Sequence, residues 1–174
     1  LMSVPYSPRQ WGSTSPVEMM RLMAGEDHNF YIDYFQEPGK VEKDLEVNIR
    51  ELTTKFLYSL SGDAVPEKRW RFIFAKNEKF SDTCYLPDSR PAWLTEADID
   101  FFAGEFERTG YSTSINWYRN WDRNWELTPF LTGAKIQQPS MFIAGTEDSV
   151  VTMMGPAIEN QEASMTDLRK KVII

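Results

Sequence analysis

Apolar residues recur at helical spacing through much of the chain, with charged residues between them. The clearest example runs from Lys40 to Leu60 and is followed by Gly62, a common helix stop. Apolar residues at this period form one buried face of an α-helix and leave the opposite face in water. The pattern therefore predicts one long helix over 40–60 whose buried face carries Val41, Leu45, Ile49, Leu52, Phe56 and Leu60.

Two further helices are marked by capping residues. Ser15 is a candidate N-cap, with Pro16 at the first helical position, and this helix is expected to end at Gly25. Thr95 is followed three residues later by a carboxylate that can complete a capping box, and Gly110 is expected to close this helix. Residues 1–12 and 63–93 show no sustained period and are expected to be irregular, the second stretch with room for one short helix.

The pattern changes near the C-terminus. Residues 139–145 form a short continuous apolar run, which is typical of a buried parallel strand, and a helix over 155–165 and a second strand over 167–174 follow. Two strands cannot form a sheet with protected edges, so further strands must come from elsewhere. The chain begins at Leu1 and ends in what resembles a strand just starting, and we expect both ends to be cut from a longer protein.

Composition excludes several classes of protein. The chain has 174 residues, of which 41% are hydrophobic, enough for one ordinary core. Its 26 acidic and 19 basic residues give a net charge of -7, which argues against binding to nucleic acid or to an anionic membrane. It has neither an apolar stretch of roughly 18 residues nor a secretion signal. We expect a soluble, cytoplasmic protein.

The single cysteine and the single histidine limit the chemistry further. Cys84 alone excludes an intrachain disulfide and a thiolate metal cluster. His28 alone excludes a multi-histidine metal site and leaves one candidate for histidine-based catalysis. We expect neither a metal nor a cofactor.

Residues 30–39 form an aromatic segment that ends in a Pro-Gly turn. It contains Phe30, Tyr31, Tyr34 and Phe35, which can make an apolar wall that still presents phenolic hydroxyls. By composition alone, an aromatic core segment ahead of a helix is the more common explanation.

Residues 116–127 are expected to form a helix that carries three tryptophans. Trp117, Trp121 and Trp125 recur every four residues and so form one stripe, while Tyr118 stands on the neighbouring face. The simpler interpretation is a stripe that packs on the core. Three polar residues would then be solvated on the opposite side: Arg119, Asp122 and Arg123.

Asp148 follows the predicted strand over 139–145. Active sites of open α/β sheets lie beyond the carboxyl ends of the strands, which favours Asp148 over an average surface acid. Aspartate and serine after a strand also form simple turns, so the position alone is a weak indication.

Four segments, in order, resemble the lid and acid-loop motifs of soluble epoxide hydrolases, which have the α/β-hydrolase fold. They are Tyr-Phe-Gln-Glu-Pro-Gly at 34–39, the stretch 97–111 that ends in Gly-Glu-Phe-Glu-Arg-Thr-Gly-Tyr, Asn-Trp-Tyr-Arg-Asn at 116–120, and Ala-Gly-Thr-Glu-Asp at 144–148. The match spans nearly the whole chain and is weakest over 63–90. Four ordered motifs are specific together, although none would be alone.

The resemblance implies an α/β fold class, with a mostly helical lid and a strand-helix-strand piece of the core sheet. Residues 1–12 would end a core segment, 13–127 would form the lid (cap) domain, and 128–174 would belong to the C-terminal part of the core, before the catalytic histidine.

The resemblance also implies roles for five residues. In that family an aspartate attacks an epoxide carbon, two lid tyrosines hydrogen-bond the ring oxygen, and a histidine held by a second carboxylate activates water. Tyr31 and Tyr118 match the tyrosine pair, and Asp148 matches the acid that orients the histidine. Phe35 and Trp121 match positions that line the substrate cavity. Phenols with an ordinary pKa of about 10 can stabilise an alkoxide while they stay neutral.

The chain departs from the family pattern in what it lacks. The catalytic residues of α/β-hydrolases follow one another along the chain in the order nucleophile, acid, histidine, and this chain holds only the acid. It has no nucleophile elbow. His28 has no counterpart in the family pattern. The resemblance therefore assigns an epoxide hydrolase activity to a parent protein, which could form a homodimer. The isolated chain should be inactive and should need the remainder of the core as its partner.

Two alternatives remain open. A haloalkane dehalogenase shares the fold and the aspartate nucleophile, but it needs indole or amide N–H groups to hold the halide, whereas Tyr31 and Tyr118 favour an epoxide. A module without catalytic activity could use the aromatic residues to bind an apolar ligand.

Overall fold

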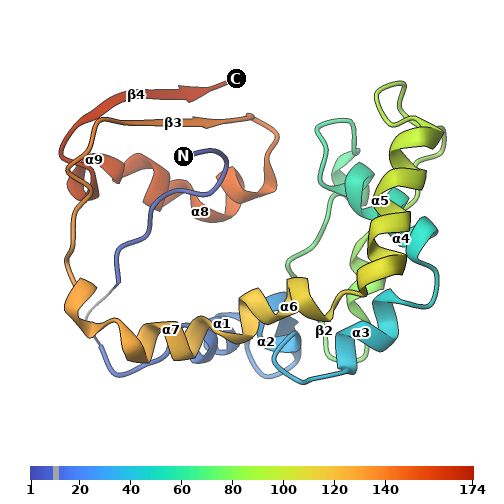
Figure 1. The fold of residues 1–174 in the computed structure, drawn as a ribbon, viewed down its shortest axis with the longest axis horizontal. Coiled ribbons are helices and arrows are strands. Elements are labelled where there is room, and N and C mark those ends of the chain that lie inside the picture. Colours follow the sequence, from blue (N-terminus) through green and yellow to red (C-terminus); the bar gives the residue numbers. More distant parts are fainter. Residues whose placement is uncertain (10–11) are drawn as a thin grey trace. The chain divides into compact units, whose positions relative to one another are not determined.

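The computed structural model describes residues 1–9 and 12–174. Gln10 and Trp11, part of the stretch expected to be irregular, lie outside the described residues. The chain divides into two compact units (Figure 1). We call Thr14–Asn124 the helical unit, and Leu1–Ser13 together with Trp125–Ile174 the sheet unit.

The helical unit contains short helices and one small hairpin. Its elements are α1 (Pro16–Ala24), β1 (His28–Phe30), α2 (Tyr31–Tyr34), α3 (Lys40–Leu45), α4 (Ile49–Ser59), the 3-10 turns η1 (Pro66–Lys68) and η2 (Phe80–Thr83), β2 (Ile73–Ala75), α5 (Glu96–Thr109), α6 (Ser112–Arg119) and the start of α7 (Trp121–Leu127). Among the described residues, no helix has the length and apolar character needed to cross a membrane.

The two helices predicted from their caps are confirmed. The Ser15 hydroxyl accepts a backbone N–H from the first turn of α1, and Gly25 ends the helix with a φ of 78°. Thr95 and Asp98 form a complete capping box at α5, in which each side chain accepts the other's backbone N–H, at 3.2 Å and 2.9 Å. Gly110 closes α5 at a φ of 68°, a conformation that glycine adopts without strain.

The single helix predicted over 40–60 is wrong, because α3 and α4 are separate helices. Asn48 leaves the helical conformation, with a φ of -149°, and its side chain accepts the backbone N–H of Glu51 at 3.1 Å. Asparagine favours such a cap over a helix interior because its amide competes for backbone groups. The apolar positions on both sides of the break still pack into one cluster.

Residues 63–93 contain more regular structure than expected. Besides η1 and η2 they supply β2, which pairs antiparallel with β1, with Phe30 opposite Ile73. Phe74, in the middle of β2, is 1% exposed. Strands of three residues are too short for an alternating pattern to be recognised in the sequence.

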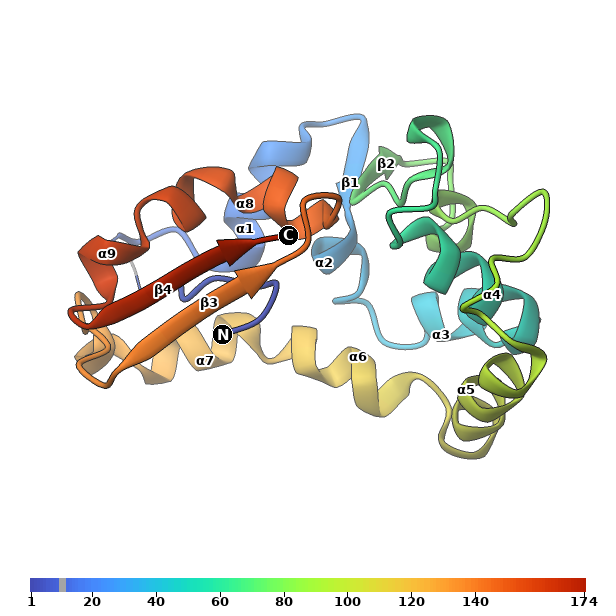
Figure 2. The same ribbon diagram turned by 90° about the horizontal axis from the view of Figure 1, so that it is seen from above.

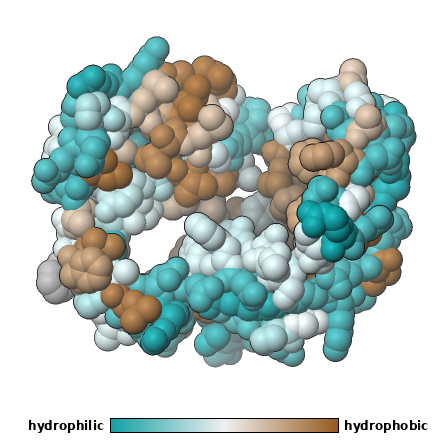
Figure 3. Space-filling model, viewed as in Figure 1, coloured by the Kyte–Doolittle hydropathy of each residue, from teal (hydrophilic) through white to brown (hydrophobic). Residues whose placement is uncertain are grey.

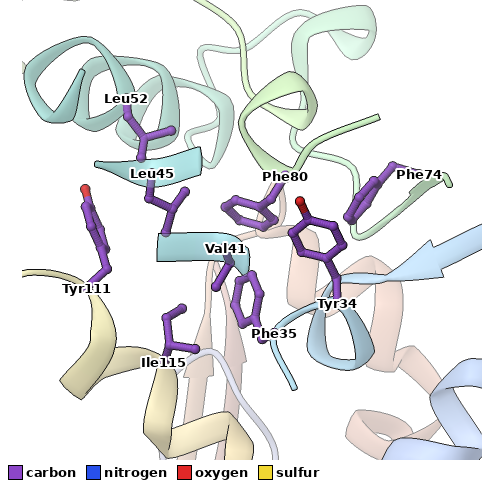
Figure 4. Packing of buried hydrophobic residues seen from close by; sticks show 9 residues of the cluster. All are labelled: Tyr34, Phe35, Val41, Leu45, Leu52, Phe74, Phe80, Tyr111 and Ile115. Atoms are coloured by element: carbon purple, nitrogen blue, oxygen red, sulfur yellow. The ribbon is translucent and has the colours of Figure 1, made fainter. Parts of the chain in front are cut away.

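The helical unit encloses its own hydrophobic core (Figure 4). The cluster draws on α2, α3, α4, β2, η2 and the start of α6, so segments far apart in the sequence converge on it. Its buried members are Tyr34, Phe35, Val41, Leu45, Leu52, Phe74, Phe80, Tyr111 and Ile115.

The helix predicted over 116–127 is also wrong in its bounds. It begins earlier, at Ser112, and is interrupted at Asn120, whose side-chain amide donates to the carbonyl of Asn116 at 2.8 Å. The tryptophan stripe does not pack on the core as a whole, because Trp117 is 76% exposed. Only Trp121 and Trp125 are half-buried.

The sheet unit is built around two parallel strands, β3 (Ser140–Ala144) and β4 (Leu168–Ile173), which confirms both predicted strands. The helices α8 (Ser149–Glu159) and α9 (Gln161–Ser164) lie along the strands (Figures 1 and 2), and η3 (Pro129–Leu131) precedes them. The predicted helix over 155–165 starts too late, since α8 begins six residues earlier, at Ser149, with Asp148 as its cap, and it is divided at Asn160, which separates α8 from α9.

The first residues of the chain pair with β3 on the edge away from β4. Met2 bridges Ile143 in parallel, and the Ser3 N–H donates to the Ile143 carbonyl at 2.9 Å. Hydrophobic side chains gather on the surface around the strands and α8 (Figure 3). Met141 and Ile173, which are 48% and 43% exposed, contribute to the apolar surface of this unit.

Candidate active site

The structure brings Tyr31 and Tyr118 together. Tyr31 is the first residue of α2, directly after β1, and Tyr118 lies near the end of α6. Their ring centroids are 5.7 Å apart, and the ring planes meet at 77°, an edge-to-face arrangement. The two predicted tyrosines are therefore neighbours in one half-buried aromatic site.

Phe35 and Trp121 complete this aromatic site. Phe35 lies one helical turn after Tyr31 and makes edge contacts with both tyrosine rings, at 5.4 Å from Tyr31 and 5.3 Å from Tyr118. Trp121 contacts Tyr118 from the start of α7, with ring centroids 6.2 Å apart. Four of the five predicted site residues thus lie in contact within the helical unit.

Burial sets the protonation of the two phenols. It raises the pKa of Tyr31 well above the ordinary value of 10, and a negative charge on Tyr118 would raise it further. Burial also raises the pKa of Tyr118. Both hydroxyls are consequently neutral hydrogen-bond donors at pH 7 and in mildly alkaline solution.

Gln36 connects the two elements that carry the tyrosines. Its side-chain amide donates to the carbonyl of Ile32 in α2 at 2.8 Å and to the carbonyl of Tyr118 in α6 at 3.2 Å. This contact fixes the backbone at Tyr118 relative to α2. Gln36 lies within the motif at 34–39, but its contact joins segments that are distant in the sequence, so residue spacing does not predict it.

A second connection between these elements is made by Arg119, and the expectation that Arg119 is solvated is wrong. Its guanidinium donates to both carboxylate oxygens of Glu42, at 2.7 Å and 3.0 Å, and to the carbonyl of Phe35 at 2.9 Å. The two charged side chains are only 13% and 11% exposed. The hydrogen bonds from Arg119 hold the pKa of Glu42 below its usual value, so the pair stays ionised at neutral pH.

Asp122 was likewise expected to be solvated, and it is not. Its carboxylate accepts hydrogen bonds from the Ser15 hydroxyl at 2.7 Å and from the Val17 N–H at 2.9 Å. Asp122 therefore attaches the start of α7 to the N-terminus of α1, where a negative charge is favourable.

Asp148 lies in the sheet unit, just beyond the carboxyl end of β3, at the place that the sequence predicted. Its side chain accepts the Val150 N–H at 2.8 Å and caps α8, while its own N–H donates to the Gly145 carbonyl at 3.2 Å. The carboxylate is half-buried and needs only one oxygen for the cap. The other oxygen can accept a further hydrogen bond.

A cavity of about 290 Å³ lies within the helical unit, with Phe35 and Tyr118 in its wall. Side chains of α3, α4, α5, α6 and η2 line the rest of it. This cavity is not predictable from the sequence, because it is formed between helices and not along one of them. Within the described parts of the chain, no group of three or more His, Cys, Asp or Glu side chains is placed to hold a metal ion.

Comparison with known proteins confirms the resemblance to epoxide hydrolases. No protein-family model matches the chain. Epoxide hydrolase A of Mycobacterium tuberculosis is 38% identical over 151 residues, which cover 87% of this chain and 46% of that protein. Epoxide hydrolase 1 of Siraitia grosvenorii is 38% identical over 155 residues, or 88% of this chain and 45% of that protein.

A solved structure agrees with these relatives. The epoxide hydrolase from an endophytic Streptomyces superposes with a TM-score of 0.90 at 38% identity, covering 99% of this chain and 51% of that one. The homologues and structural neighbours are thus epoxide hydrolases of the α/β-hydrolase type, and the chain has part of that fold. It spans about half the length of the relatives it matches.

Proposed function

We propose that this homologue of the epoxide hydrolases supplies the lid and the acid loop of an enzyme that hydrolyses an epoxide to a vicinal diol. The observation that carries the proposal is the contact between the Tyr31 and Tyr118 rings, 5.7 Å apart in a half-buried aromatic site. The helical unit would be the lid, and the sheet unit would belong to the α/β-hydrolase core.

The two phenols would act on the ring oxygen. Attack on an epoxide carbon by an aspartate outside this chain would break the C–O bond and place negative charge on that oxygen. Tyr31 and Tyr118 would donate hydrogen bonds to it, and their raised pKa values keep both protons in place until that charge develops. Phe35 and Trp121 would line the substrate cavity around them.

Asp148 would orient the histidine that activates water for hydrolysis of the alkyl ester. Its position beyond the end of β3 and its free acceptor capacity suit this role. The histidine, like the nucleophile, would come from the remainder of the core. A cytoplasmic location and a homodimer stay predictions.

Haloalkane dehalogenation is the second candidate function, and one observation favours it. The indole nitrogen of Trp70 is buried and has no hydrogen-bond partner among the described residues, and its ring lies 5.0 Å from that of Tyr31. An unpaired indole N–H is the kind of donor that could hold a halide ion. The tyrosine pair, which a halide does not require, favours the epoxide.

The test is to replace both tyrosines with phenylalanine in the complete enzyme. Removal of one such donor typically lowers turnover by about 10²–10³, so the double variant should lose measurable epoxide opening. Tyr34→Phe is the matched control, because Tyr34 is a buried tyrosine of the same helix that packs on Phe74 and should leave turnover unchanged. Epoxide turnover retained in the double variant would refute the proposal, and halide release from a chloroalkane by the unaltered enzyme would favour the alternative.

A further inference from the structure

Four aromatic rings surround the ring of Tyr31. Phe30 precedes it in the chain and stacks on it at 5.3 Å, and Phe35 follows it one turn later. Tyr118 approaches from α6 at 5.7 Å, and Trp70 approaches from the stretch between η1 and β2 at 5.0 Å. By ring centroid, Trp70 is the nearest of the four, and its contact is edge to face, with the ring planes at 70°.

Backbone contacts bring Trp70 to Tyr31. The N–H of Tyr31 donates to the carbonyl of Phe72 at 3.0 Å, directly beyond the pairing of β1 with β2. Trp70 lies two residues before Phe72, and its own N–H donates to the carbonyl of Ser59, the last residue of α4, at 3.0 Å. The hairpin and α4 together therefore fix the indole beside Tyr31, although the two residues are far apart in the sequence.

The surroundings of the Trp70 indole are apolar. Besides Tyr31 it contacts Phe56 at 6.3 Å, Phe72 at 6.2 Å and Phe80 at 6.4 Å. Its N–H is buried, and no described residue accepts a hydrogen bond from it. Because a buried N–H without an acceptor costs stability, the favourable contacts of the indole here are those of its ring. A ring enclosed in this way has little freedom to move, so it can hold Tyr31 in place.

Trp70 meets one phenol of the pair and not the other. The ring contacts of the described residues join Trp70 to Tyr31 and include none between Trp70 and Tyr118, which is bounded by Phe35 and Trp121. Burial raises the pKa of Tyr31, and the indole is one of the groups that bury it. The two tyrosines thus depend on different neighbours for their orientation.

We propose that Trp70 is a positioning residue for Tyr31, whose ring it holds at the angle from which the phenol donates to the epoxide oxygen, and that it does not act on Tyr118. The reaction in this statement rests on the proposed function, whereas the packing of Trp70 on Tyr31 does not. The proposal gives a role in the site to residues 63–90, where the resemblance to the family is weakest.

The first test removes the ring in the complete enzyme. A displacement of about 1 Å can cost on the order of 10²-fold in rate, so Trp70→Leu should lower kcat about tenfold to a hundredfold and change KM less than about threefold. Trp70→Phe, which keeps an aromatic edge against Tyr31, should restore most of kcat. Trp93→Leu is the matched control, because Trp93 is 49% exposed and its indole donates to Asp63, and it should change neither quantity.

An equal loss of kcat in Trp70→Phe and Trp70→Leu would overturn the proposal, because the ring would then not be the group that acts. If Trp70→Leu does not fold, Trp70→Met fills more of the vacated space and takes its place in every comparison.

The second test asks whether Trp70 acts through Tyr31. In a Tyr118→Phe enzyme, Trp70→Leu should lower the remaining turnover by the same factor as in the unaltered enzyme. In a Tyr31→Phe enzyme it should have almost no further effect, because the phenol that it positions is gone. General damage to the site would lower turnover equally in both backgrounds, and that result would overturn the proposal.

The third test needs no catalysis. Nuclear magnetic resonance of tyrosines labelled with 13C at Cζ follows the ionisation of each phenol, and Tyr31→Phe identifies the signal of Tyr31. Trp70→Leu should lower the pKa of Tyr31 towards the ordinary value of 10, because water reaches the phenol, whereas Trp93→Leu should leave it unchanged. A pKa that Trp70→Leu does not lower would overturn the positioning role even in an active enzyme. A lowered pKa in an enzyme that opens no epoxide would support the packing of Trp70 on Tyr31 and refute the proposed function.

Discussion

The helical unit and the sheet unit differ in how completely they enclose a core. The helical unit buries a cluster drawn from six of its elements, and Phe74 and Val41 in it are 1% and 0% exposed. Among the described residues, a cluster in the sheet unit consists of only Phe142, Ala144 and Ile158. Most of the buried hydrophobic side chains that the structure describes, and with them most of the hydrophobic stabilisation, therefore lie in the helical unit.

The difference also separates the two parts of the proposed catalytic machinery. The tyrosine pair is fixed within the helical unit by Gln36 and by the pair of Arg119 and Glu42. Asp148 follows β3 in the sheet unit, where β4 pairs only with β3 among the described residues. Parallel sheets are normally covered on both faces and extended by further strands. The geometry of the phenols is thus set within the helical unit, whereas we expect the geometry of the acid to depend on the further strands that the proposed parent core would supply.

The largest change in the free energy of unfolding is expected when a buried phenylalanine is removed, and its size should differ between the two units. In the 174-residue chain, Phe74→Ala should lower the free energy of unfolding by about 3–5 kcal/mol, because it leaves a cavity in a closed core. Phe142→Ala, although Phe142 is 0% exposed, should have less than half that effect on the same transition. Urea unfolding followed by near-UV circular dichroism measures both. Equal losses would show that the sheet unit is as self-contained as the helical unit.

A smaller effect on stability is expected at Arg119, whose hydrogen bonds to Glu42 and to the Phe35 carbonyl connect the elements that carry the two tyrosines. Arg119→Met removes two hydrogen bonds from the largely buried carboxylate of Glu42, which should cost about 2–3 kcal/mol of stability. Arg119→Lys keeps the charge but loses the two-pronged contact, so its loss should be intermediate. In the complete enzyme, kcat should fall more than KM rises, because the phenols lose alignment while the cavity persists. The surface pair of Arg108 and Glu105 provides the control, and Arg108→Met should change neither quantity.

Local signals in the sequence were sufficient for part of the fold. Capping residues marked the start of α1 and α5, and an uninterrupted apolar run marked β3. The break between α3 and α4 was missed because a single asparagine cap overrides an apolar period that continues on both sides. The hairpin of β1 and β2 was missed because its pairing is long-range and its strands have three residues each.

The prediction of the site depended on the family resemblance and not on local signals in the sequence. Composition and spacing favoured an aromatic core segment at 30–39 and a buried tryptophan stripe, and the stripe is wrong for Trp117. The pairing of Tyr31 with Tyr118 came from the resemblance of four ordered motifs, and the structure shows the two rings in contact. Gln36 and Arg119 lie inside those motifs, yet their contacts cross between elements. Such contacts between distant elements can be seen only in the three-dimensional structure.

The smallest expected change in stability concerns Asp148 and separates its structural role from its proposed catalytic role. Asp148→Ala removes the cap of α8 and should cost about 1 kcal/mol, whereas asparagine can accept the same Val150 N–H and should cost almost nothing. A neutral amide cannot stabilise an imidazolium, so Asp148→Asn should still lower kcat of the complete enzyme on the order of 10³–10⁴-fold. Thermal unfolding and steady-state kinetics on both variants make the comparison. If Asp148→Asn retained full activity, the carboxylate would be only a helix cap, and the acid that holds the histidine would have to lie elsewhere.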